Sequence, residues 1–210
     1  MNSLGSESSI RAVIWDMGGV LVRTENQAPR ERLAERHGLT LKQLYNLVFD
    51  TEVSAKATLG IVQEESVWQN IARTLNLDPE GLAAFMQEFW AGDGLDAGLH
   101  QFVNGLRANY KIGLLSNAWS GARSVLDQRY HMLDIFDVTI FSAEVGLAKP
   151  DPRIYQLVLG KLGVEAAQAI FVDDFQANID AANSLGMHGV SFKNSLQARQ
   201  DVMQIIANLK

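Results

Sequence analysis

Acidic and small polar residues stand directly after short apolar runs at several separate places in the chain. Asp16 follows one run, Ser116 a second, and the adjacent pair Asp173-Asp174 another. Three carboxylates brought together would repel one another, and burying the adjacent pair without a cation is expensive. Mg²⁺ binds through one or two carboxylates together with backbone and substrate oxygens. If the fold gathers these residues, they predict a site for a hard divalent cation such as Mg²⁺.

A second group of residues offers contacts for an anion. Ser116 carries a hydroxyl, the backbone N–H groups of Asn117 and Ala118 follow it, and Lys149 brings a positive charge. Asp16 is a candidate nucleophile, because a carboxylate can attack phosphorus to form an aspartyl-phosphate. Taken singly, each of these residues is more often a structural cap or a loop residue. Taken together, they predict a pocket for a phosphate group.

Short apolar runs position these residues and indicate buried strands, because they are too short for helices and rich in β-branched side chains. They cover residues 10–15, 111–115, 138–141, 169–172 and 189–192. Helical periodicity occupies residues 121–130, 152–162 and 176–185, so strands and helices alternate. The alternation predicts an α/β fold with a Rossmann-like parallel sheet core, in which ligands bind beyond the carboxyl ends of the strands.

The long gap between the first two strands indicates an insertion, since a single crossover helix needs far fewer residues. Helical periodicity there covers residues 30–36, 41–49, 63–75 and 79–90, and a further helix at 97–109 leads into the second strand. The pairs Asp78-Pro79 and Asp151-Pro152 mark helix starts. We predict an inserted α-helical bundle cap at residues 23–95, with residues 1–22 and 96–210 forming the core domain.

The ordered set of polar sites resembles the four motifs of the haloacid dehalogenase-like (HAD) hydrolase superfamily. The segments that carry the resemblance are Ile14-Trp15-Asp16 with Gly19-Val20-Leu21, Leu114-Leu115-Ser116-Asn117, Lys149-Pro150, and Phe171-Val172-Asp173-Asp174. Each motif alone is weak, whereas the set in family order is specific. The resemblance runs from residue 10 onward and places the helical insertion where a C1 cap belongs.

The resemblance implies a Mg²⁺-dependent phosphatase of small-molecule phosphomonoesters that works through an aspartyl-phosphate. The metal ligands that it implies are Asp16, the Gly18 carbonyl, Asp174 and, nearby or through water, Asp173. Asp16 would also be the nucleophile. Ser116 and Lys149 would hold the transferring phosphoryl group, whose charge must be stabilised throughout the transfer.

One position departs from the common family pattern. Most phosphatases of this superfamily carry a second Asp two residues after the nucleophile, where it protonates the leaving group and then activates water. Here that residue is Gly18. General acid–base help contributes about 10²–10⁴ in rate, so we expect slower turnover unless another group or water substitutes. Some family members with a similar Asp-x-Gly sequence are nevertheless phosphatases.

Several residues are candidates for substrate contacts. Trp119 and Phe175 lie next to the predicted site and would shape its pocket, with Ser116, Asn117 and Lys149 binding the phosphate. Lys56, in the segment 49–60 that resembles the part of C1 caps reaching over the active site, is a further candidate. Its plainer interpretation is a solvated lysine on a helix face. The other aromatic residues of the insertion follow helical periods and indicate bundle core: Trp68, Phe85, Phe89 and Trp90.

Composition excludes several classes of protein. The chain of 210 residues is 47% apolar and 20% charged, which is typical of globular domains. Its 18 Lys and Arg against 24 Asp and Glu give a net charge of −6 with no basic cluster, which disfavours nucleic acid. No apolar run reaches the roughly 18 residues of a membrane helix, and the segment from Met1 to Ser9 lacks a signal-peptide core. With no cysteine in the chain, we expect a cytoplasmic protein; the oligomeric state stays open.

Two other functions compete with the phosphatase. The metal-independent 2-haloacid dehalogenases of the same superfamily also lack the second Asp, but they usually carry Ser or Asn-type residues in place of the pair Asp173-Asp174. A catalytically weak binding or scaffold protein would need neither the acids nor Ser116 and Lys149. Retention of the acidic pair with the phosphate-binding residues favours the metal-dependent phosphatase.

Overall fold

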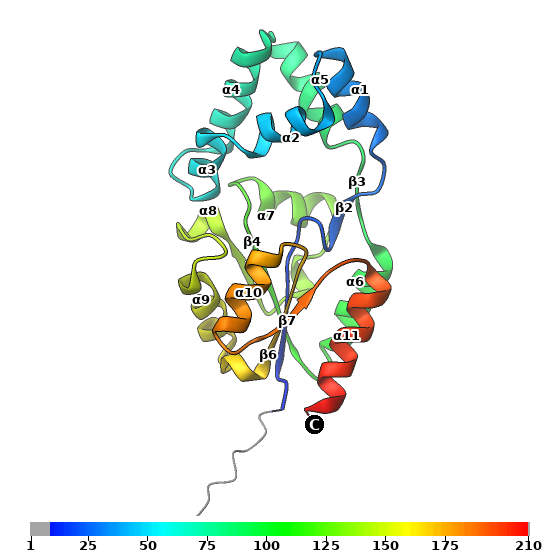
Figure 1. Ribbon diagram of the computed structural model, residues 1–210, viewed down its shortest axis with the longest axis vertical. Helices are drawn as coiled ribbons and strands as arrows, with labels where there is room; N and C mark the ends of the chain where they lie inside the picture. The colour runs from blue at the N-terminus through cyan, green and yellow to red at the C-terminus, as the bar shows by residue number, and fades with distance from the viewer. Residues whose placement is uncertain (1–8, 210) are drawn as a thin grey trace, which may run out of the picture.

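The computed structural model, which describes residues 9–209, contains a parallel sheet with a helical insertion above it (Figure 1). The sheet has five strands in the order β5-β4-β1-β6-β7, all parallel. Their bounds are β1 Ala12–Trp15, β4 Lys111–Ser116, β5 Val138–Phe141, β6 Ala169–Asp173 and β7 His188–Ser191. The predicted α/β class and Rossmann-like parallel sheet are therefore confirmed, and the predicted strands nearly coincide with the observed ones.

Alternate residues of β1 face two separate apolar layers, as expected for a strand with helices on both sides of its sheet. Val13 and Trp15 pack with α6 (Ala97–Leu106) and α11 (Ser195–Asn208). Ala12 and Ile14 pack with α9 (Pro152–Leu162) and α10 (Gln176–Ser184). All of these strand residues are fully buried, so the strand that leads to Asp16 is held from both sides.

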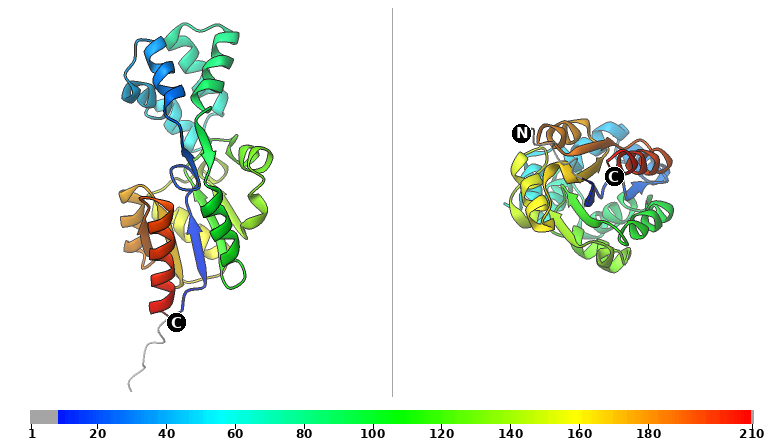
Figure 2. Two further views of the ribbon diagram at one scale, coloured as in Figure 1. Left: turned by 90° about the vertical axis from the view of Figure 1, so that its right-hand side faces the viewer. Right: turned by 90° about the horizontal axis from the view of Figure 1, so that it is seen from below.

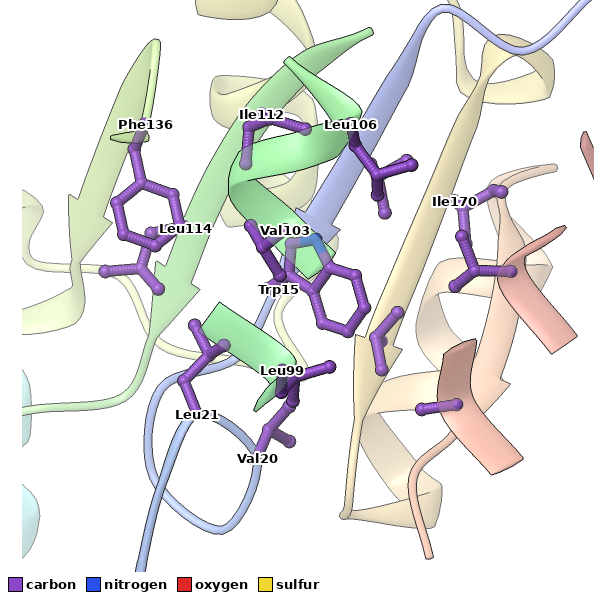
Figure 3. Close-up of a cluster of buried hydrophobic side chains, with 14 of the residues drawn as sticks. Trp15, Val20, Leu21, Leu99, Val103, Leu106, Ile112, Leu114, Phe136 and Ile170 are labelled. Atoms are coloured by element: carbon purple, nitrogen blue, oxygen red, sulfur yellow. The ribbon is translucent and has the colours of Figure 1, made fainter. Parts of the chain in front are cut away.

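Trp15 is the largest side chain in the layer beneath the first polar site. Figure 3 shows its ring among Leu99, Val103 and other apolar residues of α6 and the neighbouring strands. The ring of Phe102 meets it edge to face at 6.2 Å between centroids. This packing fixes the end of β1 one residue before Asp16.

The insertion consists of helices placed between two short strands that pair with each other. The strands are β2 Val22–Thr24 and β3 Asp93–Leu95, antiparallel, and neither is predicted from the sequence pattern. The helices are α1 Ala28–Arg36, α2 Leu41–Phe49, α3 Glu52–Thr58, α4 Glu64–Leu75 and α5 Pro79–Phe89. The strand pair is the connection between the sheet and the helices (Figure 2, left). Only α3 lacks a predicted counterpart, and the division at residues 22/23 and 95/96 stays a prediction.

A buried arginine secures this connection to the helices. Arg30 of α1 donates to both carboxylate oxygens of Asp93, at 2.9 and 2.8 Å, and to the carbonyl of Phe89 at 2.9 Å. Its guanidinium also lies 4.3 Å from the centroid of the Phe89 ring. Hydrogen bonds between a guanidinium and a carboxylate are among the stronger ones, so the base of the insertion is well fixed.

The remaining elements are short, apart from the C-terminal helix α11, which the sequence analysis does not predict. They are α7 Ala122–Ser124, η1 Val125–Arg129, η2 Leu133–Ile135, α8 Ser142–Val145 and η3 Ala166–Gln168. The predicted helix at 121–130 is thus divided into α7 and a π-helical turn.

The proline-marked helix starts are confirmed, since Asp78 and Asp151 accept hydrogen bonds from the N–H groups of Gly81 and Arg153. Across residues 9–209, no helix has the length and apolar character required to span a bilayer. The predicted absence of a signal peptide concerns a segment of which residues 1–8 lie outside the described part.

Candidate active site

Asp16 lies at the carboxyl end of the central strand. Its backbone N–H donates to the carbonyl of Val172 in β6 at 2.9 Å, and its carboxylate oxygen Oδ1 accepts from the N–H of Met17 at 2.7 Å. The residue is 8% exposed. Asp16 therefore combines a fixed backbone with a nearly buried carboxylate.

Lys149 joins this carboxylate to the motif that follows β6. Its Nζ lies 2.9 Å from Oδ1 of Asp16 and 2.6 Å from Oδ2 of Asp173, and its side chain is almost fully buried. The ring of Phe171 lies beneath the ammonium group, with its centroid 5.5 Å from Nζ. The positive charge of a lysine between two carboxylates offsets part of the repulsion between them. The structure thus brings together the predicted residues Asp16, Lys149 and Asp173.

Asp173 is the most enclosed of the acids and has no exposed surface. Besides Lys149, its carboxylate accepts from the N–H of Phe175 at 2.8 Å and from Nδ2 of Asn178 at 3.0 and 3.1 Å. Asn178 is in turn held through its carbonyl by the hydroxyl of Tyr155, at 3.0 Å. These contacts make Asp173 a residue that orients Lys149. Asn178, five residues after Asp173, is a positioning residue of this site.

The three acids form a group of the kind that binds a divalent cation. Oxygen atoms of Asp16, Asp173 and Asp174 all lie within 4.8 Å of one another, and only Asp174 is exposed. Lys149 compensates one of the three negative charges, so the group keeps a net negative charge. Carboxylate oxygens are suitable ligands for Mg²⁺, and the Gly18 carbonyl stays a predicted further ligand. The donor set fits the predicted ion.

Gly19 is pressed against Asp174. A Cβ atom on Gly19 would lie 2.1 Å from Oδ2 of Asp174, and the glycine has a φ of +79°. Both the left-handed backbone and the close approach require glycine here. The sequence analysis treats this position only as part of a motif, whereas the structure shows that it leaves room for an acid from another strand.

Burial shifts the proton affinity of the acids. It raises the pKa of Asp16 to about 7; the charge of Lys149 opposes the shift and that of Asp173 adds to it. The pKa of Asp174 is also raised, by burial and then by Asp173. Both shifts reflect carboxylates placed where their charged form lacks solvation. A bound divalent cation would favour the ionised forms.

The loop after β4 supports Lys149 from the other side. Ser116 ends β4 as a buried residue, and the Asn117 side chain makes two hydrogen bonds of 2.8 Å with the backbone N–H and carbonyl of Lys149, which precedes a cis proline. Asn117 therefore positions Lys149 with its side chain. The N–H of Ala118, expected to donate to an anion, donates instead to the hydroxyl of Ser142 at 2.9 Å, because α8 packs against this loop.

The predicted substrate contacts have different surroundings. Trp119 packs against the insertion, with its ring centroid 5.6 Å from that of Phe49 and 5.8 Å from that of Trp68. Phe175 directly follows the acids and is 66% exposed. Lys56 is half exposed and pairs with Glu52 one helical turn away, at 2.6 Å. Its position agrees with the plainer interpretation of a solvated helix-face lysine.

Comparison with known proteins identifies the family of this chain and several relatives. A family model for haloacid dehalogenase-like hydrolases matches residues 10–186. Sesquiterpene phosphatase astK of Aspergillus oryzae is 24% identical, over 95% of this chain and 98% of its own. Phosphatase MT3486 of Mycobacterium tuberculosis is 27% identical, over 96% of this chain and 95% of its own.

Solved structures show the same fold. A predicted HAD-like hydrolase from Porphyromonas gingivalis superposes with a TM-score of 0.74 at 22% identity, covering 93% of this chain and 98% of that one. A HAD family enzyme from Bacteroides thetaiotaomicron, in complex with magnesium and inorganic phosphate, gives 0.71 at 19% identity, covering 88% and 94%. With the family model spanning most of its length, this chain belongs to the haloacid dehalogenase-like hydrolase family.

Proposed function

We propose that the protein is a Mg²⁺-dependent phosphatase of small-molecule phosphomonoesters. The observation that carries the proposal is the buried Lys149, placed between Asp16 and Asp173 beside an exposed third acid, Asp174. In this proposal, these residues supply a nucleophilic carboxylate, a cation for the phosphoryl oxygens and the metal ligands. Two relatives of nearly the same length carry the name phosphatase, which supports the same class.

In the proposed reaction, Asp16 attacks the phosphorus atom of the bound ester. The bond between phosphorus and the ester oxygen breaks, and that oxygen keeps the electron pair and takes a proton from water, since residue 18 is glycine. A second water then attacks the phosphorus atom of the aspartyl-phosphate and gives its proton to the hydroxide left by the first step. The bond between phosphorus and the Asp16 oxygen breaks, which releases inorganic phosphate and restores the free carboxylate. Lys149 and the hydroxyl of Ser116 stabilise the phosphoryl charge in both steps.

Asp16, Asp174 and the Gly18 carbonyl would hold the metal, with Asp173 behind them. Mg²⁺ supplies positive charge that allows an anionic phosphoryl group to approach the carboxylates. Asp173 keeps Lys149 in place through its 2.6 Å contact, and Asn178 keeps Asp173 in place. The proposed partners are therefore small-molecule phosphate esters.

The acidic group also separates this function from a 2-haloacid dehalogenase. An acid cluster with a net negative charge would repel a haloacid carboxylate, whereas with Mg²⁺ it becomes favourable to a phosphate dianion. A scaffold protein does not need a buried lysine between buried acids, because burying these charges costs desolvation energy. Both observations favour the phosphatase.

A phosphate-release screen over metabolite esters, with Mg²⁺ or with a chelator, tests the proposal. We expect Mg²⁺-dependent release by the wild type and its loss in Asp16→Asn, with Asp127→Asn, an exposed acid of η1, as the matched control. A panel of 2-haloacids is run beside it. Halide release without metal, or equal phosphate release by both Asn variants, would overturn the proposal.

A further inference from the structure

Two aromatic residues stand on opposite sides of the strand that carries Asp16. Trp119 lies three residues beyond the end of β4, and Phe175 lies two residues beyond the end of β6. In the sheet, β4 and β6 are the two neighbours of β1. Because all three strands are parallel, their carboxyl ends meet at one edge. The two aromatic residues therefore flank the approach to Asp16.

The helical insertion adds a third ring. Phe49, the last residue of α2, lies 5.6 Å from Trp119 between ring centroids, and Figure 1 shows α2 on the side of the insertion that faces the sheet. Phe49 also contacts Trp90, at 6.1 Å, within the apolar cluster of the insertion. We call Phe49, Trp119 and Phe175 the aromatic collar.

The collar leaves apolar surface in water. Phe49 is 44% exposed although it contacts several rings, and Phe175 is 66% exposed. Phe175 also occupies the N-cap of α10, where it makes no side-chain hydrogen bond to the helix. Ser, Thr, Asp and Asn are favoured at that position. Neither core packing nor helix capping therefore accounts for a phenylalanine at this place.

Positive charge is absent from the loops that carry the collar. Residues 117–121 and 174–178 contain neither Lys nor Arg. Lys56, the predicted substrate contact of the insertion, is paired with Glu52. Lys149 is bound to Asp16 and Asp173, beside the position of the transferring phosphoryl group. A second phosphate or carboxylate on the substrate would lie against aromatic rings, and these two loops offer no cation to bind it.

We infer that the aromatic collar binds the leaving group of the substrate and selects monophosphate esters of apolar alcohols or phenols. This inference rests on the proposed phosphatase function and narrows its substrate class. Rings on both sides of the approach remove an apolar group from water at little cost in side-chain entropy. Phe175, next to the acids and exposed, is the residue that contributes most to this selection.

Unbranched alkyl phosphates test the inference, because their leaving groups have nearly equal basicity and differ only in apolar surface. With Mg²⁺ and the full chain, we expect kcat/KM to rise from ethyl through butyl to octyl phosphate, by up to about fourfold for each methylene that becomes fully buried. Glycerol phosphate and a sugar bisphosphate should be poorer than butyl phosphate. The steepness of the rise measures contact with the collar.

Phe175→Ser is the decisive variant, since serine is favoured at the N-cap and the helix should keep its stability. We expect this variant to lose most of the preference for octyl over ethyl phosphate, measured as the ratio of the two kcat/KM values, in which any general loss of activity cancels. Leu196→Ser, at an equally exposed apolar residue of α11 and outside the loops after β4 and β6, is the control and should keep that preference. Calorimetric binding of octylphosphonate and methylphosphonate gives the same comparison without turnover.

The outcomes separate this inference from the proposed function. Turnover of all esters with no dependence on chain length, or a preference for the bisphosphate, overturns the aromatic collar as a leaving-group site and leaves the phosphatase intact. An unchanged preference in Phe175→Ser overturns it as well. Absence of phosphate release from every ester overturns the proposed function, and equal binding of the two phosphonates then overturns the collar separately.

Discussion

The Cα atom of Gly19 and the carboxylate of Asp174 are in such close contact that a Cβ atom on the glycine would lie 2.1 Å from Oδ2. One residue belongs to the loop after β1 and the other follows β6, so this contact sets the spacing between two parts of the acid group. The proposed metal site depends on the absence of a side chain at Gly19 as much as on the acids themselves.

We expect Gly19→Ala to weaken Mg²⁺ binding at least tenfold, because the new methyl group must displace Asp174. Gly38→Ala is the control: this glycine has a similar φ of +67°, with nothing within 4 Å of an added Cβ. Both variants should lose roughly 1 kcal/mol of stability from backbone strain. Calorimetric titration with Mg²⁺ distinguishes them, and equal affinities would contradict the proposed contact.

Lys149→Met should destabilise the metal-free protein by about 3–5 kcal/mol, because it leaves Asp16 and Asp173 buried without their cation. Mg²⁺ should restore part of this loss, since it replaces the missing positive charge. Urea unfolding with Mg²⁺ and with a chelator measures both effects. Lys161→Met, at an exposed lysine of α9, should behave as the wild type. A destabilisation that Mg²⁺ leaves unchanged would contradict the prediction.

The raised pKa of Asp16, about 7 in the metal-free protein and caused mainly by burial, predicts a pH dependence of stability. The folded state holds this proton more tightly than the unfolded chain does. The contribution of Asp16 to stability therefore falls as pH rises from about 4 to about 7. Mg²⁺ binding should release a proton in the same range and become tighter with rising pH.

Unfolding curves for the wild type and Asp16→Asn, measured in chelator across this pH range, isolate the effect. The wild type should lose stability relative to the variant as pH increases. Parallel stability profiles would show that the carboxyl group of Asp16 has an ordinary pKa.

Gly18→Asp should raise the turnover of alkyl phosphates more than that of aryl phosphates, because an aryl oxygen leaves without protonation. A Cβ atom on Gly18 would meet nothing within 4 Å, so the site has room for the new side chain. The measurement is the ratio of kcat/KM values for ethyl phosphate and p-nitrophenyl phosphate, in which any loss of folded protein cancels. An unchanged ratio in a variant that still binds Mg²⁺ would show that another group already supplies the proton.

We predict that residues 23–95 move relative to the sheet, because a lid excludes water from phosphoryl transfer. Such a movement requires release of a contact between α4 and the loop after β4. Oε2 of Glu64 accepts from the N–H of Gly121 at 3.0 Å, while Oε1 accepts from the indole N–H of Trp68 at 2.9 Å. Glu64→Ala should increase hydrogen exchange around Gly121 and in α4. Glu65→Ala, the exposed neighbour, is the control. Equal exchange in both variants would contradict a role for Glu64 in holding the insertion closed.

The apolar pattern of the chain determined the strands, most helices and the order of the polar sites. A short apolar run such as residues 111–115 predicts a buried strand, and a polar residue directly after it must lie near the edge of the sheet. Parallel strands place these edges together, so the predicted meeting of Asp16, Lys149 and Asp173 could be derived without coordinates. The two short strands β2 and β3 escaped prediction because three residues carry too little periodicity.

Only the tertiary structure decided which partner each polar group takes. The Asn117 side chain binds the backbone of Lys149, Asn178 binds Asp173, and the N–H of Ala118 donates to Ser142. The contact of Trp119 with Phe49 likewise joins segments about seventy residues apart. A sequence pattern records whether a residue is buried and on which face of its own element. The partner depends on which distant segment occupies the neighbouring space, and that is set by the packing of the whole chain.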